Sequence, residues 1–171
     1  MNSANYRKNL ILKHDYLYEI RGNRYGNCTY CGIPASALDH VPPISWTDSA
    51  NEKAKKEMNF YKLPSCEECN NALGNLRLFS VLERIHHVHS WLKNKYKKAL
   101  RMPYWDEDEL QELSSTMVAE VRKAEKQSAW VKSRIVYRPD KELLLLNCNE
   151  GDTYAQATTL CTRTSVTLWG D

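Results

Sequence analysis

Two Cys-x-x-Cys pairs constrain the fold of this 171-residue chain more than any other feature. Cys28 and Cys31 form the first pair, Cys66 and Cys69 form the second, and 34 residues separate Cys31 from Cys66. A tight turn within each pair can place both sulfurs on one side, as a tetrahedral zinc ion requires. Four thiolates leave no coordination position for a substrate, so we expect a structural zinc ion and not a catalytic one.

The overall composition predicts one compact domain, or a small core with an appended lobe. Hydrophobic residues make up 42% of the chain and charged residues 26%, which is ordinary for a globular protein. No apolar run reaches the length of a membrane span or a secretory signal, which predicts a cytoplasmic protein with no membrane partner. In that reducing compartment paired cysteines favour metal binding over disulfides, and the isolated Cys148 and Cys161 are interpreted as buried thiols.

The charge of the chain is unevenly distributed. Residues 1–103 carry 16 Lys and Arg against 9 Asp and Glu, whereas residues 104–171 carry 8 against 12. The net charge of +3 therefore combines a basic front half with an acidic back half. A basic front half suits a polyanion such as DNA, and the acidic back half argues against a protein that wraps nucleic acid uniformly.

Hydrophobic spacing and stop signals predict an α+β protein. We expect an N-terminal helix over residues 5–21, short strands near 33–41 and 59–63, and a polar loop or short helix over 45–57. A further helix should begin near Cys69. In the C-terminal part we expect two long helices, one over residues 80–101 and one over residues 106–131. A hairpin is predicted from residues 134–138 and 142–147, and a late strand over residues 158–169.

These elements suggest three regions. Residues 1–24 would form an N-terminal helix, residues 25–80 a metal-stapled core, and residues 81–171 a mainly helical extension with a few late β-segments.

An acid and an imidazole stand side by side between the two cysteine pairs. Asp39 and His40 precede Val41-Pro42-Pro43, and Asn70 directly follows the last cysteine. Consecutive residues of a strand point to opposite faces, but the prolines suggest that the strand ends here. One of the two side chains could then bind a metal while the other meets the substrate. Simpler roles for Asn70 and Asn59 are a helix cap and a strand-edge amide.

In this order, the residues resemble the HNH endonucleases, the ββα-metal or His-Me finger family, in the group that carries a zinc-ribbon frame. The resemblance covers about 50 residues and rests on the two cysteine pairs, Asp39-His40, Asn59 and Asn70. It implies a ββα core stapled by zinc and the hydrolysis of phosphodiester bonds in DNA. It further implies a product with a 5′-phosphate and a 3′-hydroxyl.

By resemblance, His40 would be the general base that activates water. Asp39 and Asn70 would hold Mg²⁺ or another divalent cation, and Asn59 would brace the loop and the base. Family members often carry a lysine after the asparagine that follows the cysteines, where this chain has Ala72, so a phosphate contact would come from Lys62 or Arg77.

The helix predicted over residues 80–101 is a candidate for backbone contacts with DNA. Its basic residues include Arg84, Lys93 and Lys97, although their spacing equally fits a solvated helix face. His86, His87 and His89 lie on the same helix, where they would converge poorly on a second metal. Cutting both strands with one small site usually needs a dimer, so a homodimer is a possible assembly.

Two other functions fit the same sequence. One is a zinc-ribbon module that binds nucleic acid without cleaving it. The other is an interaction protein in which zinc stabilises a small domain and the acidic helix at 106–131 recruits a partner. The presence of Asp39, His40 and Asn70 favours the nuclease over both, because neither alternative requires them.

Overall fold

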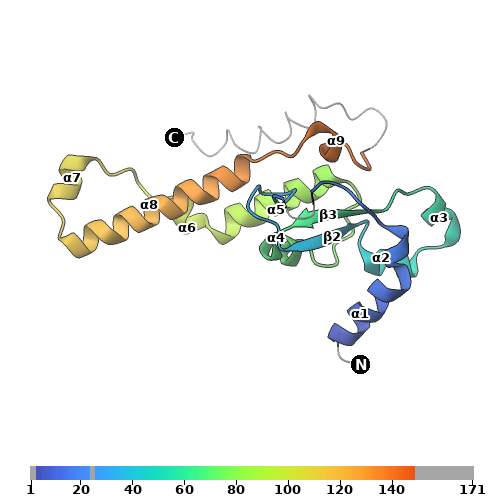
Figure 1. Cartoon of the computed structure of the whole chain (residues 1–171). Helices are drawn as coiled ribbons and strands as arrows, with labels where there is room; N and C mark the ends of the chain where they lie inside the picture. Colours follow the sequence, from blue (N-terminus) through green and yellow to red (C-terminus); the bar gives the residue numbers. More distant parts are fainter. Residues whose placement is uncertain (1–2, 24–25, 149–171) are drawn as a thin grey trace.

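A small sheet lies against a set of helices in the computed structural model, which describes residues 3–23 and 26–148 (Figure 1). The architecture is mixed α and β, as the sequence predicts. The expected strand at residues 158–169 lies outside the described residues.

The sheet has three strands in the order β1–β3–β2. β2 (Ala37–Val41) pairs antiparallel with β3 (Tyr61–Ser65), and the two-residue β1 (Glu19–Ile20) pairs parallel with β3. The next element is α4 (Glu67–Leu73), which packs against β2. The segment that holds the two cysteine pairs and Asp39-His40 is thus a β–β–α unit.

Two short helices connect β2 to β3. α2 (Ile44–Ser49) follows Pro43, and α3 (Glu52–Lys56) is capped by Asn51, whose side chain accepts a hydrogen bond from the backbone N–H of Ala54. The polar segment left open as loop or helix is therefore largely helical. Its polarity fits its place on the surface, because no residue of α3 is buried.

The N-terminal helix ends earlier than its apolar spacing predicts. α1 (Ser3–His14) is followed by a single 3-10 turn, η1 (Asp15–Leu17), and then by β1. The backbone N–H of Glu19 donates to Phe60, which begins the pairing with β3. Pairing with β3 and burial of Tyr18 in a small hydrophobic cluster compensate for the helical hydrogen bonds that are not formed, so the tertiary contacts override the local helical pattern.

The C-terminal half of the described chain is helical. The first two helices are α5 (Val81–Lys95) and α6 (Lys97–Leu100), and the next are α7 (Glu107–Gln111), α8 (Ser115–Val136) and α9 (Lys141–Leu144). Capping boxes start α5 and α7, where Ser80 pairs with Glu83 and Asp106 pairs with Glu109. The predicted helix over 106–131 is therefore two helices.

The hairpin predicted around Pro139 is wrong. Residues 134–136 are the last residues of α8, and residues 141–144 form the short helix α9. The reason is that Val131 and Ile135 lie one helical turn apart and are both buried in the main core. Burial of this apolar face outweighs the short alternating pattern that suggested strands.

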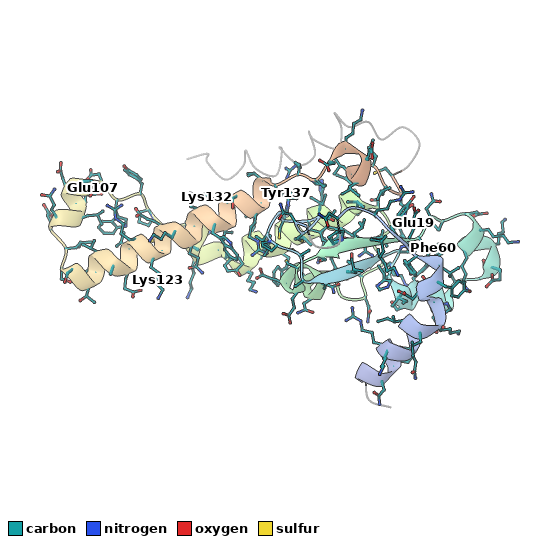
Figure 2. The ribbon with its side chains drawn as sticks, in the orientation of Figure 1. Glu19, Phe60, Glu107, Lys123, Lys132 and Tyr137 are labelled. Atoms are coloured by element: carbon teal, nitrogen blue, oxygen red, sulfur yellow. The ribbon has the colours of Figure 1, made fainter. Side chains whose placement is uncertain are left out.

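One hydrophobic core joins the cysteines to the C-terminal helices. It contains the four cysteines, Leu63 of β3 and Ile85 of α5, and also Val131 and Ile135 of α8. The base of α8 is thus part of the core, whereas its other end and α7 extend far from the sheet (Figure 1). We call α7 and α8 together the arm. In Figure 2, Tyr137 lies at the base of the arm and Glu107 at its tip.

A second, smaller cluster holds the N-terminal elements in place. Leu10 of α1, Tyr18 and Ile44 of α2 are buried together, with Phe60 packed beside them. Among the described helices, none combines the length and the apolar character needed to cross a membrane.

Candidate metal centre and histidine site

The side chains of Cys28, Cys31, Cys66 and Cys69 form a buried cluster. Their sulfur atoms all lie within 4.8 Å of one another, and the residues are 0–4% exposed. The Cys31 and Cys66 sulfurs are 3.8 Å apart, so they are free thiols and not a disulfide. A tetrahedral zinc with Zn–S bonds of about 2.3 Å would place its sulfurs about 3.8 Å apart. The donor set and its size therefore fit zinc.

Each cysteine pair is shaped by a local backbone feature. In the first pair, the N–H of Gly32 donates to the carbonyl of Cys28, and Gly32 has a positive φ of 75°. In the second, Cys66 is the N-cap of α4, and its sulfur accepts a hydrogen bond from the N–H of Cys69 at 3.4 Å. These short-range interactions explain why the spacing predicts the shape of each pair, whereas the meeting of the two pairs, with Cys31 and Cys66 35 positions apart, depends on tertiary packing.

Gly32→Ala is expected to destabilise the protein by about 1–3 kcal/mol. The backbone at Gly32 is left-handed, and an added Cβ would lie 2.4 Å from Cδ2 of Tyr137. Gly74→Ala is the matched control, because Gly74 also has a positive φ but an added Cβ there would meet nothing nearer than 3.6 Å. Urea unfolding of the three proteins measures the difference. Equal losses of stability for the two variants would show that contact with Tyr137 is unimportant.

Asp39 is buried and already has two partners. Its Oδ2 accepts a hydrogen bond from the Tyr30 hydroxyl at 2.5 Å and pairs with Nη1 of Arg84, also at 2.5 Å. The Arg84 guanidinium is itself fixed, since its Nε donates to the carbonyl of Leu78. Both bonds to Asp39 use the same oxygen, which leaves Oδ1 as the oxygen that could bind a cation.

His40 lies on the opposite face of β2, as strand alternation requires. Its Nε2 is 3.2 Å from Oδ1 of Asp15, and its ring packs edge-on against Tyr18 with the ring centres 4.8 Å apart. Lys62, the cross-strand neighbour of His40, binds the other oxygen of Asp15 at 2.9 Å. Burial lowers the pKa of His40 below its ordinary value, and the hydrogen bond to Asp15 opposes that shift. The ring is therefore uncharged near neutral pH.

The structure contradicts the simpler interpretation of Asn70 as a helix cap, but not that of Asn59 as a strand-edge or turn amide. Asn70 lies inside α4 and is half-buried, so it does not cap the helix; Cys66 does. Asn59 is exposed two residues before β3, and its carbonyl accepts a hydrogen bond from Nδ2 of Asn147. Within the described part of the chain, no hydrogen bond or ion pair joins the side chains of Asp39, His40 and Asn70 to one another.

The basic residues selected from sequence fall into different environments. Arg84 is only 1% exposed and is bound to Asp39, so it does not lie on a solvated helix face. Lys62 is mostly buried beside Asp15. Arg77 and Lys97 are exposed, and Lys93 is half-buried.

The histidines of α5 do not form a second metal site among the described residues. Nε2 of His87 lies 3.2 Å from the carbonyl of Ala72, and Nε2 of His89 lies 2.9 Å from the carbonyl of Tyr30. Burial lowers the pKa of His89 to about 4. His89 therefore connects α5 to the first cysteine turn as a neutral ring.

Because His89 is buried as a neutral ring, we expect the free energy of unfolding to fall in acid. Its pKa of about 4 in the folded protein lies below its ordinary value of 6.5, so the unfolded chain binds the extra proton more readily. The resulting stabilisation is complete above pH 6.5 and is lost as the pH falls towards 4. At pH 5 the loss from this residue should be about 2 kcal/mol.

Comparison with His89→Gln isolates this effect from acid release of the metal, because glutamine cannot titrate. Thermal unfolding of both proteins at neutral and acidic pH should show a smaller drop in stability for the variant. Equal drops would show that His89 does not control the acid sensitivity.

Sequence reasoning missed four residues that shape these sites. They are Asp15, Tyr30, Arg84 in its buried role, and Arg134, and all but Tyr30 lie at least 25 positions along the chain from the site side chains they contact. Tyr30 lies inside the first cysteine pair and was visible as an aromatic residue there. The other contacts carry no local signal, because they depend on how separate elements pack.

Comparisons with protein-family models, curated proteins and solved structures found no match to this chain. Any assignment of function therefore rests on the residues and their geometry.

Proposed function

We propose that this protein is a metal-dependent HNH endonuclease that hydrolyses phosphodiester bonds of DNA. The observation that carries the proposal is the β2–β3–α4 unit beside the four-cysteine cluster, with His40 on β2 hydrogen-bonded to a carboxylate. The fold supplies a rigid frame, and the imidazole supplies a group that can accept a proton near neutral pH.

His40 has the environment that a general base needs. Asp15 bonds to Nε2, so it fixes the orientation of the ring and favours one tautomer. The other ring nitrogen, Nδ1, is then the atom that would accept a proton from water. Lys62 shares Asp15, which keeps that carboxylate ionised and in place; the hydrogen bond from Lys62 is the main reason that the pKa of Asp15 is lowered.

A divalent cation would bind to oxygen ligands near β2 and α4. Asp39 through Oδ1 and Asn70 through its amide oxygen are the candidate ligands, and magnesium needs few protein ligands because it keeps several waters. Because Asp39 and His40 lie on opposite faces of β2, the proposal requires the scissile phosphate to reach both side chains past the end of that strand at Val41; the cation would then stabilise the charge that develops on the phosphate and the leaving oxygen. Arg84 and Tyr30 hold Asp39 by its other oxygen and so fix its position.

A basic groove supports contact with the DNA backbone on the His40 side. The groove runs between α1, η1 and α3, and its lining includes Lys13, Lys55, Lys56, Glu52 and Phe60. Lys13 pairs with Asp48 and Lys55 with Glu52, so the excess positive charge is small. Phe60 packs against Tyr18, which in turn packs against His40, so the rings of Phe60 and Tyr18 connect the groove to the histidine. This path for the phosphates differs from the α5 helix that the sequence suggested.

Incubation of the purified protein with supercoiled plasmid tests the proposal. Nicked or linear plasmid should form with Mg²⁺ and should not form with EDTA. Because EDTA can also remove zinc, a parallel sample without added Mg²⁺ but with zinc retained is the sharper control. Failure to cut any DNA substrate under these conditions would contradict the proposal.

A second function is favoured by the buried pair between Asp39 and Arg84. Both side chains are at most 6% exposed, and Arg84 already balances the charge of the carboxylate that would have to bind the cation. This arrangement suits a zinc-ribbon module that binds nucleic acid without cleaving it. A mobility shift of DNA without cleavage would favour this function, whereas Mg²⁺-dependent nicking excludes it.

A further inference from the structure

Arg134 lies within the four-cysteine cluster although it belongs to a distant part of the chain. It is near the C-terminal end of α8 and is 1% exposed. Its Nη2 lies 3.5 Å from the sulfur of Cys31, 103 residues away in the sequence, and 3.9 Å from the sulfur of Cys69. One guanidinium nitrogen thus contacts one cysteine of each pair.

Charge explains why a guanidinium suits this position. Four thiolates around one Zn²⁺ carry a net charge of −2, and Glu68 beside them adds another negative charge. Nη1 of Arg134 pairs with Oε2 of Glu68 at 2.5 Å. A buried guanidinium is costly unless negative charge surrounds it, so Arg134 is stabilised most when the cysteines are deprotonated by a bound metal.

The same end of α8 is held by neighbours of Arg134. Its guanidinium lies 4.4 Å from the centre of the Trp130 ring, and Val131 and Ile135 are buried in the core. Tyr137 lies directly against Gly32, inside the first cysteine turn. The base of the arm in Figure 2 is therefore packed against the cysteine turns themselves.

We infer that Arg134 is a charge-compensating member of the four-cysteine metal centre, and that metal binding fixes the base of α8 on the core. The guanidinium donates to metal-bound thiolates and lowers the free energy of the loaded site. By linkage, the metal stabilises the docked position of α8 by the same amount. This inference depends on the cysteine cluster alone and does not require nuclease activity.

The test measures zinc affinity in full-length Arg134→Met by competition with a chelating indicator. We expect zinc to bind about 10–100-fold more weakly than in the unmodified protein, the range seen when a residue that supports metal ligands is removed. Glu68 keeps Lys95 and Tyr96 as partners, so the variant does not leave that carboxylate alone. Arg122→Met is the matched control on the same helix, since Arg122 is half-buried and forms ion pairs with Glu107 and Glu125 instead of with the cysteines; it should change affinity less than about twofold.

A second variant, Arg134→Lys, tests the inference even if Arg134→Met fails to fold. Arg134→Lys keeps the charge but not the planar fork, so the thiolates lose part of their hydrogen bonding. With Co²⁺ in place of zinc, the thiolate-to-cobalt absorption band should move to lower energy in Arg134→Lys and stay unchanged in Arg122→Met. Unchanged cobalt absorption together with unchanged zinc affinity would overturn the inference.

Discussion

Replacing His40 by alanine is expected to lower Mg²⁺-dependent DNA cleavage by about 10²–10⁴-fold, the usual contribution of a positioned general base. The fold should survive, because His40 is partly exposed at the edge of the smaller cluster and Asp15 keeps Lys62 as its partner. Cleavage rates measured with the zinc content and circular dichroism of the same sample separate a lost base from a lost fold.

His87→Ala is the matched control for this variant. Like His40, His87 is half-buried and has one oxygen atom close to its Nε2, in this case the carbonyl oxygen of Ala72. It lies on α5 and has no proposed role in the reaction. Its rate should stay within about threefold of the unmodified protein. If both variants lost activity equally, or if His40→Ala cut normally, His40 would not be the base.

Asp39 is a poorer choice for the same experiment. Its removal leaves Arg84 buried without its carboxylate, and breaking a buried ion pair in this way costs about 3–5 kcal/mol. A loss of activity in an Asp39 variant could therefore come either from a lost metal ligand or from a destabilised fold, and the experiment would not separate the two.

Cys66→Ser is expected to release the metal and unfold the core. A structural zinc ion contributes about 10–16 kcal/mol in small zinc-binding peptides. That range is as large as the whole stability of a typical domain, about 5–15 kcal/mol. Cys66 is also the N-cap of α4, but serine is a favourable N-cap residue, so the loss of stability should come from the metal and not from the start of that helix.

The loss can be measured as zinc bound per chain and as the cooperativity of thermal unfolding. Cys148→Ser is the control for removal of a thiol, because Cys148 is half-buried and lies outside the metal cluster. It should keep the metal and unfold at nearly the same temperature. Full zinc occupancy and an unchanged transition in Cys66→Ser would show that the cysteine cluster is not a structural metal site.

The cysteine cluster and the elements around it could be predicted because their signals are local. The spacing within each pair, the serine and glutamate that cap α5, and the acidic start of α7 all act within a few residues. The mixed α and β architecture and the two main strands also followed from hydrophobic patterning, with boundaries that shifted by a few residues.

Local patterns failed where a distant surface competed with them. Residues 15–20 left the predicted helix because β1 pairs with β3. Residues 134–136, which the sequence predicted to lie in a strand, are helical because the helix buries Val131 and Ile135 in the core. In both cases the free energy of tertiary packing exceeded a weak local preference.

The sequence by itself determined how each Cys-x-x-Cys pair brings its two thiols together, and it predicted that the two pairs share one metal, because turn spacing is a local geometric rule. It left open whether Asp39 and His40 lie on opposite faces of one strand, and the structure shows that they do. Only the tertiary structure decided their partners: Arg84 for Asp39, Asp15 for His40, and Arg134 for the thiolates. Those contacts join residues 25 to 103 positions apart. Such pairings depend on how whole elements pack, and no short stretch of the chain encodes them.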